Sequence, residues 1–126
     1  MNVNILMKDS KTDGLVVKIL RRTECAQLVQ ELVFQGSPVD LADGFIHLST
    51  PSQAAETAAK HFAGESGLWL AAANPAGFAE ALKWEPSRGG ALFPHLYREL
   101  RAEDLLWIRP LPLGPEGRHL FPDLAA

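Results

Sequence analysis

Two histidines, His47 and His95, have the sequence neighbours best suited to building a reactive site. His47 lies in the run Gly44-Phe45-Ile46-His47-Leu48-Ser49, and the sequence continues directly into a capping pattern at Thr50-Pro51-Ser52-Gln53. Side chains alternate along a strand, so Phe45, His47 and Ser49 share one face while Ile46 and Leu48 share the other. The pattern predicts a polar face carrying a histidine and a serine, and it fits equally well a half-buried histidine in an ordinary strand.

His95 occupies a second strand-like run, Phe93-Pro94-His95-Leu96-Tyr97. Alternation sends Phe93, His95 and Tyr97 to one side, after a rigid entry at the proline. We therefore expect His95 to meet His47 across a sheet.

The other candidate polar and aromatic residues suit a nucleotide ligand. Histidine can donate to a ribose hydroxyl or a phosphate, and an aromatic face accepts a base or a nicotinamide ring. Glu85 either orients a ribose hydroxyl and stabilises a cationic transition state, or it is a surface partner of Lys83 or Arg88. The candidate catalytic residues are His47, Glu85 and His95, and the candidate cofactor-binding residues are Lys18, Ser49, Trp84, Arg88 and Tyr97.

Several familiar kinds of site lack their sequence patterns. No CxxC or HExxH pattern predicts a metal site, and Ser49 lacks the flanking glycines of a nucleophile elbow. No G-x-G-x-x-G or Walker loop is present. We expect Cys25 to be a small core residue, and His61 and His119 to lie outside the site.

Composition favours one globular domain. The chain has 126 residues, 47% of them hydrophobic, and a net charge of −3, with its basic residues scattered. This balance does not predict binding to duplex nucleic acid.

A single cysteine excludes an internal disulfide, and no signal peptide or membrane-spanning stretch is evident, so we expect a cytoplasmic location. Residues 1–14 are predicted to be a flexible segment before a domain over 15–126, with a proline- and glycine-rich tail from residue 110.

The order of the predicted elements favours an α+β fold with antiparallel or mixed sheets. Helices are expected after Thr23, ending at Gly36, and after Thr50, ending at Gly64. A loop is expected over 37–44 and a helical turn over 101–104. Apolar and β-branched runs predict strands over 15–20, 68–73, 81–85 and 105–108.

Taken together, these motifs resemble the small bacterial domain-of-unknown-function family 952 over roughly residues 15–110. The residues that carry the resemblance are Val16 to Leu20, Gly36 to Gln53, Leu82 to Glu85 and Phe93 to Tyr97. That family is grouped by remote similarity with the ADP-ribosyltransferase-like fold. The grouping implies two small, curved, mostly antiparallel sheets with two helices and NAD bound in the cleft between the sheets.

The resemblance also implies roles for individual residues. His47 and Ser49 match a histidine or aromatic residue followed by a small hydroxyl residue on the second core strand. Lys18 falls near the NAD-contacting residue of the first strand, where the superfamily has histidine or arginine. Either Glu85 or His95 matches the third catalytic position. His47 would then hold the ribose or pyrophosphate, Glu85 would stabilise the oxocarbenium-like ribose, and His95 would orient the nucleophile.

The implied function is that of an ADP-ribosyltransferase-like enzyme or NAD glycohydrolase, with NAD as substrate and a protein or RNA acceptor left open. One alternative is a nucleotide-binding module without catalysis. Another is an RNA-end phosphotransferase or cyclic-phosphate enzyme that uses His47 and His95 as an acid and base pair.

Overall fold

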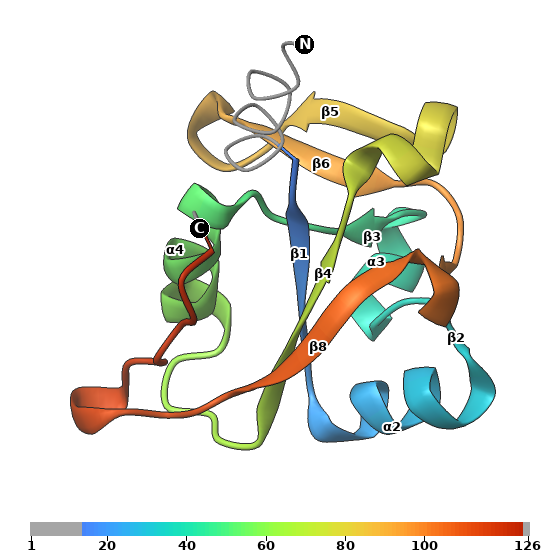
Figure 1. The fold of residues 1–126 in the computed structure, drawn as a ribbon. Helices are drawn as coiled ribbons and strands as arrows, with labels where there is room; N and C mark the ends of the chain where they lie inside the picture. The colour runs from blue at the N-terminus through green and yellow to red at the C-terminus, as the bar shows by residue number, and fades with distance from the viewer. Residues whose placement is uncertain (1–13, 125–126) are drawn as a thin grey trace, which may run out of the picture.

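The computed structural model describes residues 14–124, in which the strands form antiparallel sheets (Figure 1). The expected flexible segment therefore lies, apart from Gly14, outside the described residues. One three-stranded sheet has the order β1-β4-β8, a second has the order β3-β6-β5, and β2 pairs with β7. The strands are β1 (Val16–Leu20), β2 (Val33–Phe34), β3 (Ile46–His47), β4 (Leu68–Ala73), β5 (Leu82–Pro86), β6 (Leu92–Leu96), β7 (Leu100–Arg101) and β8 (Leu105–Leu111).

Over residues 14–124, the backbones of the two three-stranded sheets are joined by one pair of residues. The Val17 amide donates to the Ser49 carbonyl at 2.8 Å, and the Ser49 amide donates to the Val17 carbonyl at 2.9 Å. Ser49 follows β3 directly, so this bridge joins the outer edge of β1 to the second sheet. The residues after β3 are thereby fixed against β1.

Three α-helices occur in the described residues, where the sequence predicted two, and a two-stranded sheet adds to the two expected sheets. The helices are α2 (Arg22–Glu31), α3 (Pro38–Asp43) and α4 (Pro51–His61). Short 3-10 helices are η1 (Pro75–Ala81), η2 (Arg88–Gly90), η3 (Ala102–Asp104) and η4 (Pro115–Gly117). None of the helices over 14–124 is long and apolar enough to cross a membrane.

The expected loop over 37–44 is wrong, because most of it is helix α3. Ser37 caps the helix through its side chain, Pro38 takes the first turn, and Asp40 completes a capping box. Gly44 ends the helix in the left-handed region with a φ of 90°. A helix of only six residues shows too little apolar periodicity to be recognised from its pattern.

Apolar residues cover both faces of the β1-β4-β8 sheet. On one face Val17 and Ile19 pack with Ala54 and Ala58 of α4. On the other face Leu20 packs in one cluster with Leu28 of α2, Phe34 of β2 and Leu96 of β6. The chain end also returns to this core, since Leu124 is buried with the α4 residues.

Helix α2 is shorter than the sequence predicted. It spans Arg22–Glu31, and the capping residue Leu32 adopts a left-handed φ of 65° before β2. Cys25 is buried in the core as predicted, together with Leu28, but Val29 and Leu32 are exposed. The chain turns into β2 instead of continuing the expected apolar stripe.

We predict that Leu70→Ala in β4 lowers the free energy of unfolding by about 2–5 kcal/mol, because the Leu70 side chain is fully buried and the truncation leaves a cavity. Leu106→Ala is the matched control, since Leu106 is 56% exposed, and it should change stability by less than about 0.5 kcal/mol. Urea denaturation followed by tryptophan fluorescence measures both values. Equal losses would contradict this assignment of the core.

Candidate functional site

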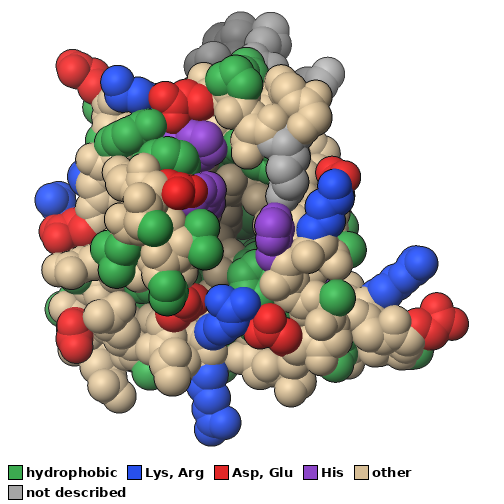
Figure 2. Space-filling view, turned by 180° about the vertical axis from the view of Figure 1, so that it is seen from behind, with side chains coloured by type: hydrophobic (Ala, Val, Ile, Leu, Met, Phe, Trp, Pro, Cys, Tyr) green, Lys and Arg blue, Asp and Glu red, His purple; other side chains and the backbone are tan. Residues whose placement is uncertain are grey.

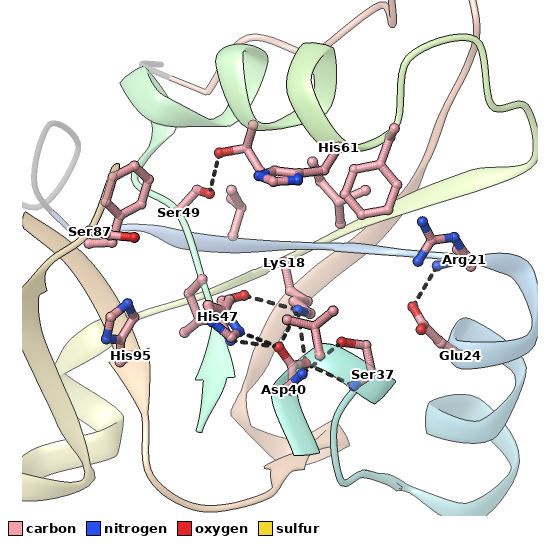
Figure 3. Close-up of a pocket in the computed structure, with 17 residues that line it drawn as sticks. Lys18, Arg21, Glu24, Ser37, Asp40, His47, Ser49, His61, Ser87 and His95 are labelled. Atoms are coloured by element: carbon pink, nitrogen blue, oxygen red, sulfur yellow. Dashed lines mark hydrogen bonds and ion pairs between the residues drawn. The ribbon is translucent and has the colours of Figure 1, made fainter. Parts of the chain in front are cut away.

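A cavity of about 380 Å³ lies beside the outer edge of β1, near the junction of the two sheets. This volume falls within the range of small-molecule sites, about 300–1,000 Å³. Figure 2 shows histidine side chains bordering a hollow on this face, and Figure 3 shows the cavity residues from close by. The lining comprises Val17, Lys18, Ile19, Arg21, Glu24, Ser37, Val39, Asp40, His47, Leu48, Ser49, Thr57, His61, Phe62, Ser87, Phe93 and His95.

Four of the sequence-predicted site residues line this cavity, namely Lys18, His47, Ser49 and His95. His47 and His95 are direct partners in the β3–β6 register, and their ring centroids lie 5.6 Å apart. The predicted meeting of the two histidines across a sheet is therefore confirmed. Three further candidates, Glu85, Trp84 and Tyr97, do not line the cavity, and the Arg88 side chain lies outside the described part of the chain.

The buried carboxylate of Asp40 connects three elements at the base of the cavity (Figure 3). Its Oδ2 lies 3.0 Å from Lys18 Nζ and accepts from the Ser37 amide at 2.9 Å. Its Oδ1 lies 2.6 Å from His47 Nδ1 and accepts from the His47 amide at 3.0 Å. Asp40 thus ties β1 and β3 to α3.

The pKa of Asp40 is set by opposing effects. Burial by itself raises the pKa of a carboxyl group, but the hydrogen bond from His47 and the positive charge of Lys18 outweigh it. They hold the pKa of Asp40 well below its usual range, with help from the amides of Ser37 and His47. Asp40 is therefore a permanent anion at neutral pH.

The Lys18 amino group is committed to interactions within the protein. Besides its ion pair with Asp40, Nζ donates to the His47 carbonyl at 3.0 Å. The Lys18 side chain is about 10% exposed. These contacts explain how a lysine is accommodated in an otherwise apolar strand, because a buried charge must be paired and hydrogen-bonded.

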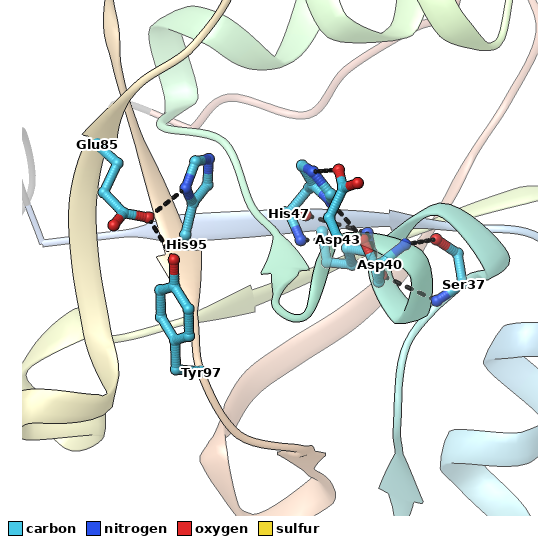
Figure 4. A network of polar contacts seen from close by, with 8 residues as sticks. Ser37, Asp40, Asp43, His47, Glu85, His95 and Tyr97 are labelled. Atoms are coloured by element: carbon cyan, nitrogen blue, oxygen red, sulfur yellow. Dashed lines mark hydrogen bonds and ion pairs between the residues drawn. The ribbon is translucent and has the colours of Figure 1, made fainter.

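Both ring nitrogens of His47 face carboxylates (Figure 4). Nδ1 contacts Asp40, and Nε2 lies 3.0 Å from Oδ2 of Asp43, whose side chain is about half exposed. A carboxylate accepts but cannot donate, so both contacts are hydrogen bonds only when both nitrogens carry a proton. Asp40 and Asp43 together fix the orientation of the His47 ring.

His95 forms a separate cluster with Glu85 and Tyr97 (Figure 4). His95 Nδ1 lies 2.7 Å from Glu85 Oε1, and the Tyr97 hydroxyl donates to the same oxygen at 2.8 Å. The hydrogen bonds from His95 and Tyr97 lower the pKa of Glu85, and the bond to Glu85 raises the pKa of Tyr97. Phe45 stacks on the His95 ring at a centroid distance of 4.1 Å. Glu85 and Tyr97 thus support His95 from behind the cavity.

The end of the cavity farthest from His95 was not predicted from the sequence (Figure 3). Arg21, Glu24, His61 and Phe62 line this end. Arg21 forms an ion pair with Glu65 and lies over the Phe62 ring at 4.6 Å. His61 is exposed, as expected for the last residue of α4, but the expectation that it lies outside the site is wrong.

His119 lies outside the cavity. Its Nε2 lies 2.7 Å from the Glu65 carbonyl oxygen. Over residues 14–124, no three histidine, cysteine or carboxylate side chains are grouped so that they could hold a metal ion.

The backbone edge of β1 forms part of the cavity lining. Val17 uses this edge to pair with Ser49, and residues two apart in a strand direct their amide and carbonyl groups to the same side. The amide and carbonyl of Ile19 therefore point toward the cavity, where Ile19 is a lining residue. No residue between 14 and 124 forms a backbone pair with Ile19 across this edge. The edge offers one donor and one acceptor side by side.

The fold and the site define an α+β protein with antiparallel sheets and a histidine-bearing cavity where two of them meet. The family model described as "Protein of unknown function (DUF952)" matches residues 19–108, and the chain belongs to this family.

Solved structures agree with this assignment. The crystal structure of protein CC0527 from Caulobacter crescentus is 49% identical, with a TM-score of 0.81 over 84% of this chain and 93% of that one. Its solution NMR structure is 50% identical, with a TM-score of 0.75 over 82% of this chain and 90% of that one. No curated protein matches the sequence.

We predict that Asp40→Asn lowers the free energy of unfolding by about 3–5 kcal/mol at neutral pH, because it leaves the buried Lys18 without its charge partner. Folding lowers the pKa of Asp40, so its contribution is fully present above the ordinary carboxyl pKa of about 4 and is lost as pH falls toward the folded value. Urea denaturation of both proteins between pH 7 and pH 2 measures the difference.

The exposed Glu103→Gln is the matched control and should leave stability nearly unchanged. A difference between wild type and Asp40→Asn that stayed constant down to pH 2 would contradict the role given to the Asp40 carboxylate.

Proposed function

We propose that this protein is a NAD-binding enzyme of the ADP-ribosyltransferase-like type and that the cavity beside β1 is its NAD site. The observation that carries the proposal is the edge of β1 at Ile19, which pairs with none of the residues 14–124 and lines a cavity also bordered by His47, Ser49 and His95. The placement of this cavity at the junction of two small antiparallel sheets supports the proposal, because NAD-binding members of that fold are expected to use the cleft between their sheets.

The Ile19 edge suits the carboxamide of nicotinamide. A carboxamide has an oxygen that accepts and an NH₂ group that donates, so it can pair with a backbone amide and carbonyl at the same time. A strand edge that is not used by another strand presents these two groups. We infer that the nicotinamide end of NAD binds at Ile19.

The side chains around this edge have roles that follow from their positions. Ser49 and His47 lie next to β1, where they can contact the nicotinamide ribose, and His95 lies across β3 from β1. Glu85 is hydrogen-bonded to His95 and does not line the cavity. It therefore acts on the reaction indirectly, by orienting His95. Lys18 fixes Asp40 and the His47 backbone and does not offer its amino group to the ligand.

We predict that NAD binds at least about tenfold more tightly than its analogue with a carboxylate in place of the carboxamide. The analogue has no N–H to donate to the Ile19 carbonyl and would place a negative charge beside it. The Ile19 carbonyl would then lack a hydrogen-bond donor, at a cost of about 1–3 kcal/mol in binding free energy. Calorimetric titration of both ligands measures the ratio, and amide chemical shifts locate the site. Equal affinities, or shifts remote from Ile19, would contradict the proposal.

The same samples test catalysis. Free nicotinamide accumulating over hours would support a transferase or glycohydrolase, whereas binding without release would instead assign a nucleotide-binding module. His47→Ala should weaken NAD binding by about 1–3 kcal/mol, and His119→Ala, which alters a histidine outside the cavity, should leave it unchanged. The amide spectrum of each variant shows whether it is folded.

The paired histidines favour a second candidate function, cleavage of a cyclic phosphate ester with His95 as base and His47 as acid. Both rings line the cavity, and each has Nδ1 on a carboxylate. This function predicts hydrolysis of a nucleoside 2′,3′-cyclic phosphate with a bell-shaped pH profile, and replacing either histidine by alanine should slow it about 10²–10⁴-fold. Phosphate-ester assays over pH 5–9 test it, and no turnover by the wild-type protein would exclude it.

A further inference from the structure

We propose that Glu85 and Tyr97 are positioning residues that make Nε2 of His95 the proton acceptor of the cavity. The reaction in which this nitrogen acts rests on the proposed function. The protonation pattern of the ring does not, because it follows from contacts within the protein.

His95 is in direct contact with Glu85. Nδ1 of His95 lies 2.7 Å from Oε1 of Glu85, and that carboxyl group is ionised at neutral pH because its hydrogen bonds lower its pKa. An ionised carboxylate only accepts hydrogen bonds, so Nδ1 must carry the proton. In the neutral ring Nε2 then has a free lone pair.

The Glu85 carboxylate and the His95 ring are both held in place. The Tyr97 hydroxyl donates to the same Glu85 oxygen at 2.8 Å, which fixes the carboxylate relative to His95. Phe45 stacks on the His95 ring with an interplanar angle of 21°. The His95 side chain is only 6% exposed, so its ring has little freedom to turn over.

His47 differs from His95 in its carboxylate contacts. Both nitrogens of His47 contact carboxylates, Nδ1 with Asp40 and Nε2 with Asp43. His95 has one such contact among the residues described, and it lines the cavity. Of the two histidines, His95 is therefore the one whose Nε2 has no carboxylate contact within residues 14–124.

The charged and titratable groups around His95 agree with this assignment. They are Glu85 and Lys83 of β5, the latter opposite His95 in the register, Tyr97 just after β6, and His47 of β3. Within the described part of the chain, Glu85 is the residue that accepts a hydrogen bond from the His95 ring.

Because Nε2 of His95 accepts a proton, it indicates which class of molecule receives the ADP-ribose in the proposed reaction. As the bond between ribose C1′ and the nicotinamide nitrogen breaks, its electron pair stays on nicotinamide, which leaves as a neutral molecule. The oxygen of water or of an alcohol forms the new bond to C1′, and its proton passes to Nε2 of His95. A neutral imidazole is a suitable base for an O–H group, so the acceptor is water or a hydroxyl.

The test is the tautomer of His95 in protein labelled with ¹⁵N at histidine, measured by long-range ¹H–¹⁵N correlation at a pH where the ring is neutral. The His95→Gln spectrum assigns the signals. We expect a protonated Nδ1 and an unprotonated Nε2 in the wild-type protein. Glu85→Ala should shift the ring toward the Nε2–H tautomer, whereas Glu85→Gln, which keeps an oxygen acceptor, should restore Nδ1–H.

Tyr97→Phe keeps the ring against Phe45 and removes only the hydroxyl, so it should loosen the Glu85 carboxylate and give a mixture of tautomers. The exposed Glu103→Gln should change nothing. A wild-type ring protonated at Nε2 would overturn the proposal, and so would a folded Glu85→Ala protein with an unchanged tautomer. The wild-type measurement remains decisive even where a variant fails to fold.

Kinetics separates this proposal from the proposed function. With NAD, Glu85→Ala should lower kcat by about 10-fold to 100-fold with little change in KM, as for other partners that orient a working histidine. Nδ1–H in the ligand-free protein without nicotinamide release would support the positioning and overturn the enzymatic function. Nicotinamide release with His95 protonated at Nε2 would support the function and overturn the positioning.

Discussion

The carboxylate of Asp40 holds the site together. It is almost completely buried, and a charge in such a place is strongly destabilising unless it is paired and hydrogen-bonded. Here it forms an ion pair with the Lys18 ammonium, contacts Nδ1 of His47, and accepts hydrogen bonds from the amides of Ser37 and His47. These partners come from β1, from β3 and from the start of α3, so satisfying one charge fixes the relative positions of three elements.

This arrangement has consequences for the sheets. Lys18 donates to the His47 carbonyl, while two residues further along the chain Ser49 pairs with Val17. The chain after β3 therefore meets β1 at one backbone pair and leaves the edge at Ile19 open toward the cavity. An open strand edge is normally a liability, since it invites another strand. In a concave site it becomes a pair of groups that can recognise a ligand.

The sequence predicted most of the strands because their signals are local. The runs over 15–20 and 68–73 became β1 and β4, and alternation placed His47 and Ser49 on one face, where both line the cavity. The capping pattern at Thr50 predicted the start of α4. Each of these inferences needs only the residue types within one element.

The unpredicted features depend on contacts between elements. Asp40 was not a candidate because nothing local shows that Lys18, 22 residues earlier, is its partner. Ser37 followed by Pro38, with Asp40 three residues after Ser37, is a capping-box pattern that predicts the start of α3. Glu85 was predicted at the site but lies behind His95, and His61 reaches the cavity only because α4 lies along it. The alternation of side chains along a strand predicts the face on which a residue lies, but it does not predict which residue of another element it contacts.

The central claim is that NAD binds at the edge of β1 between the two histidines, and a crystal structure of the chain with NAD tests it most directly. We expect the nicotinamide carboxamide within about 3 Å of the Ile19 amide and carbonyl, with the adjoining ribose between His47 and His95. NAD ordered elsewhere, or a cavity without ligand at saturating NAD, would contradict the account.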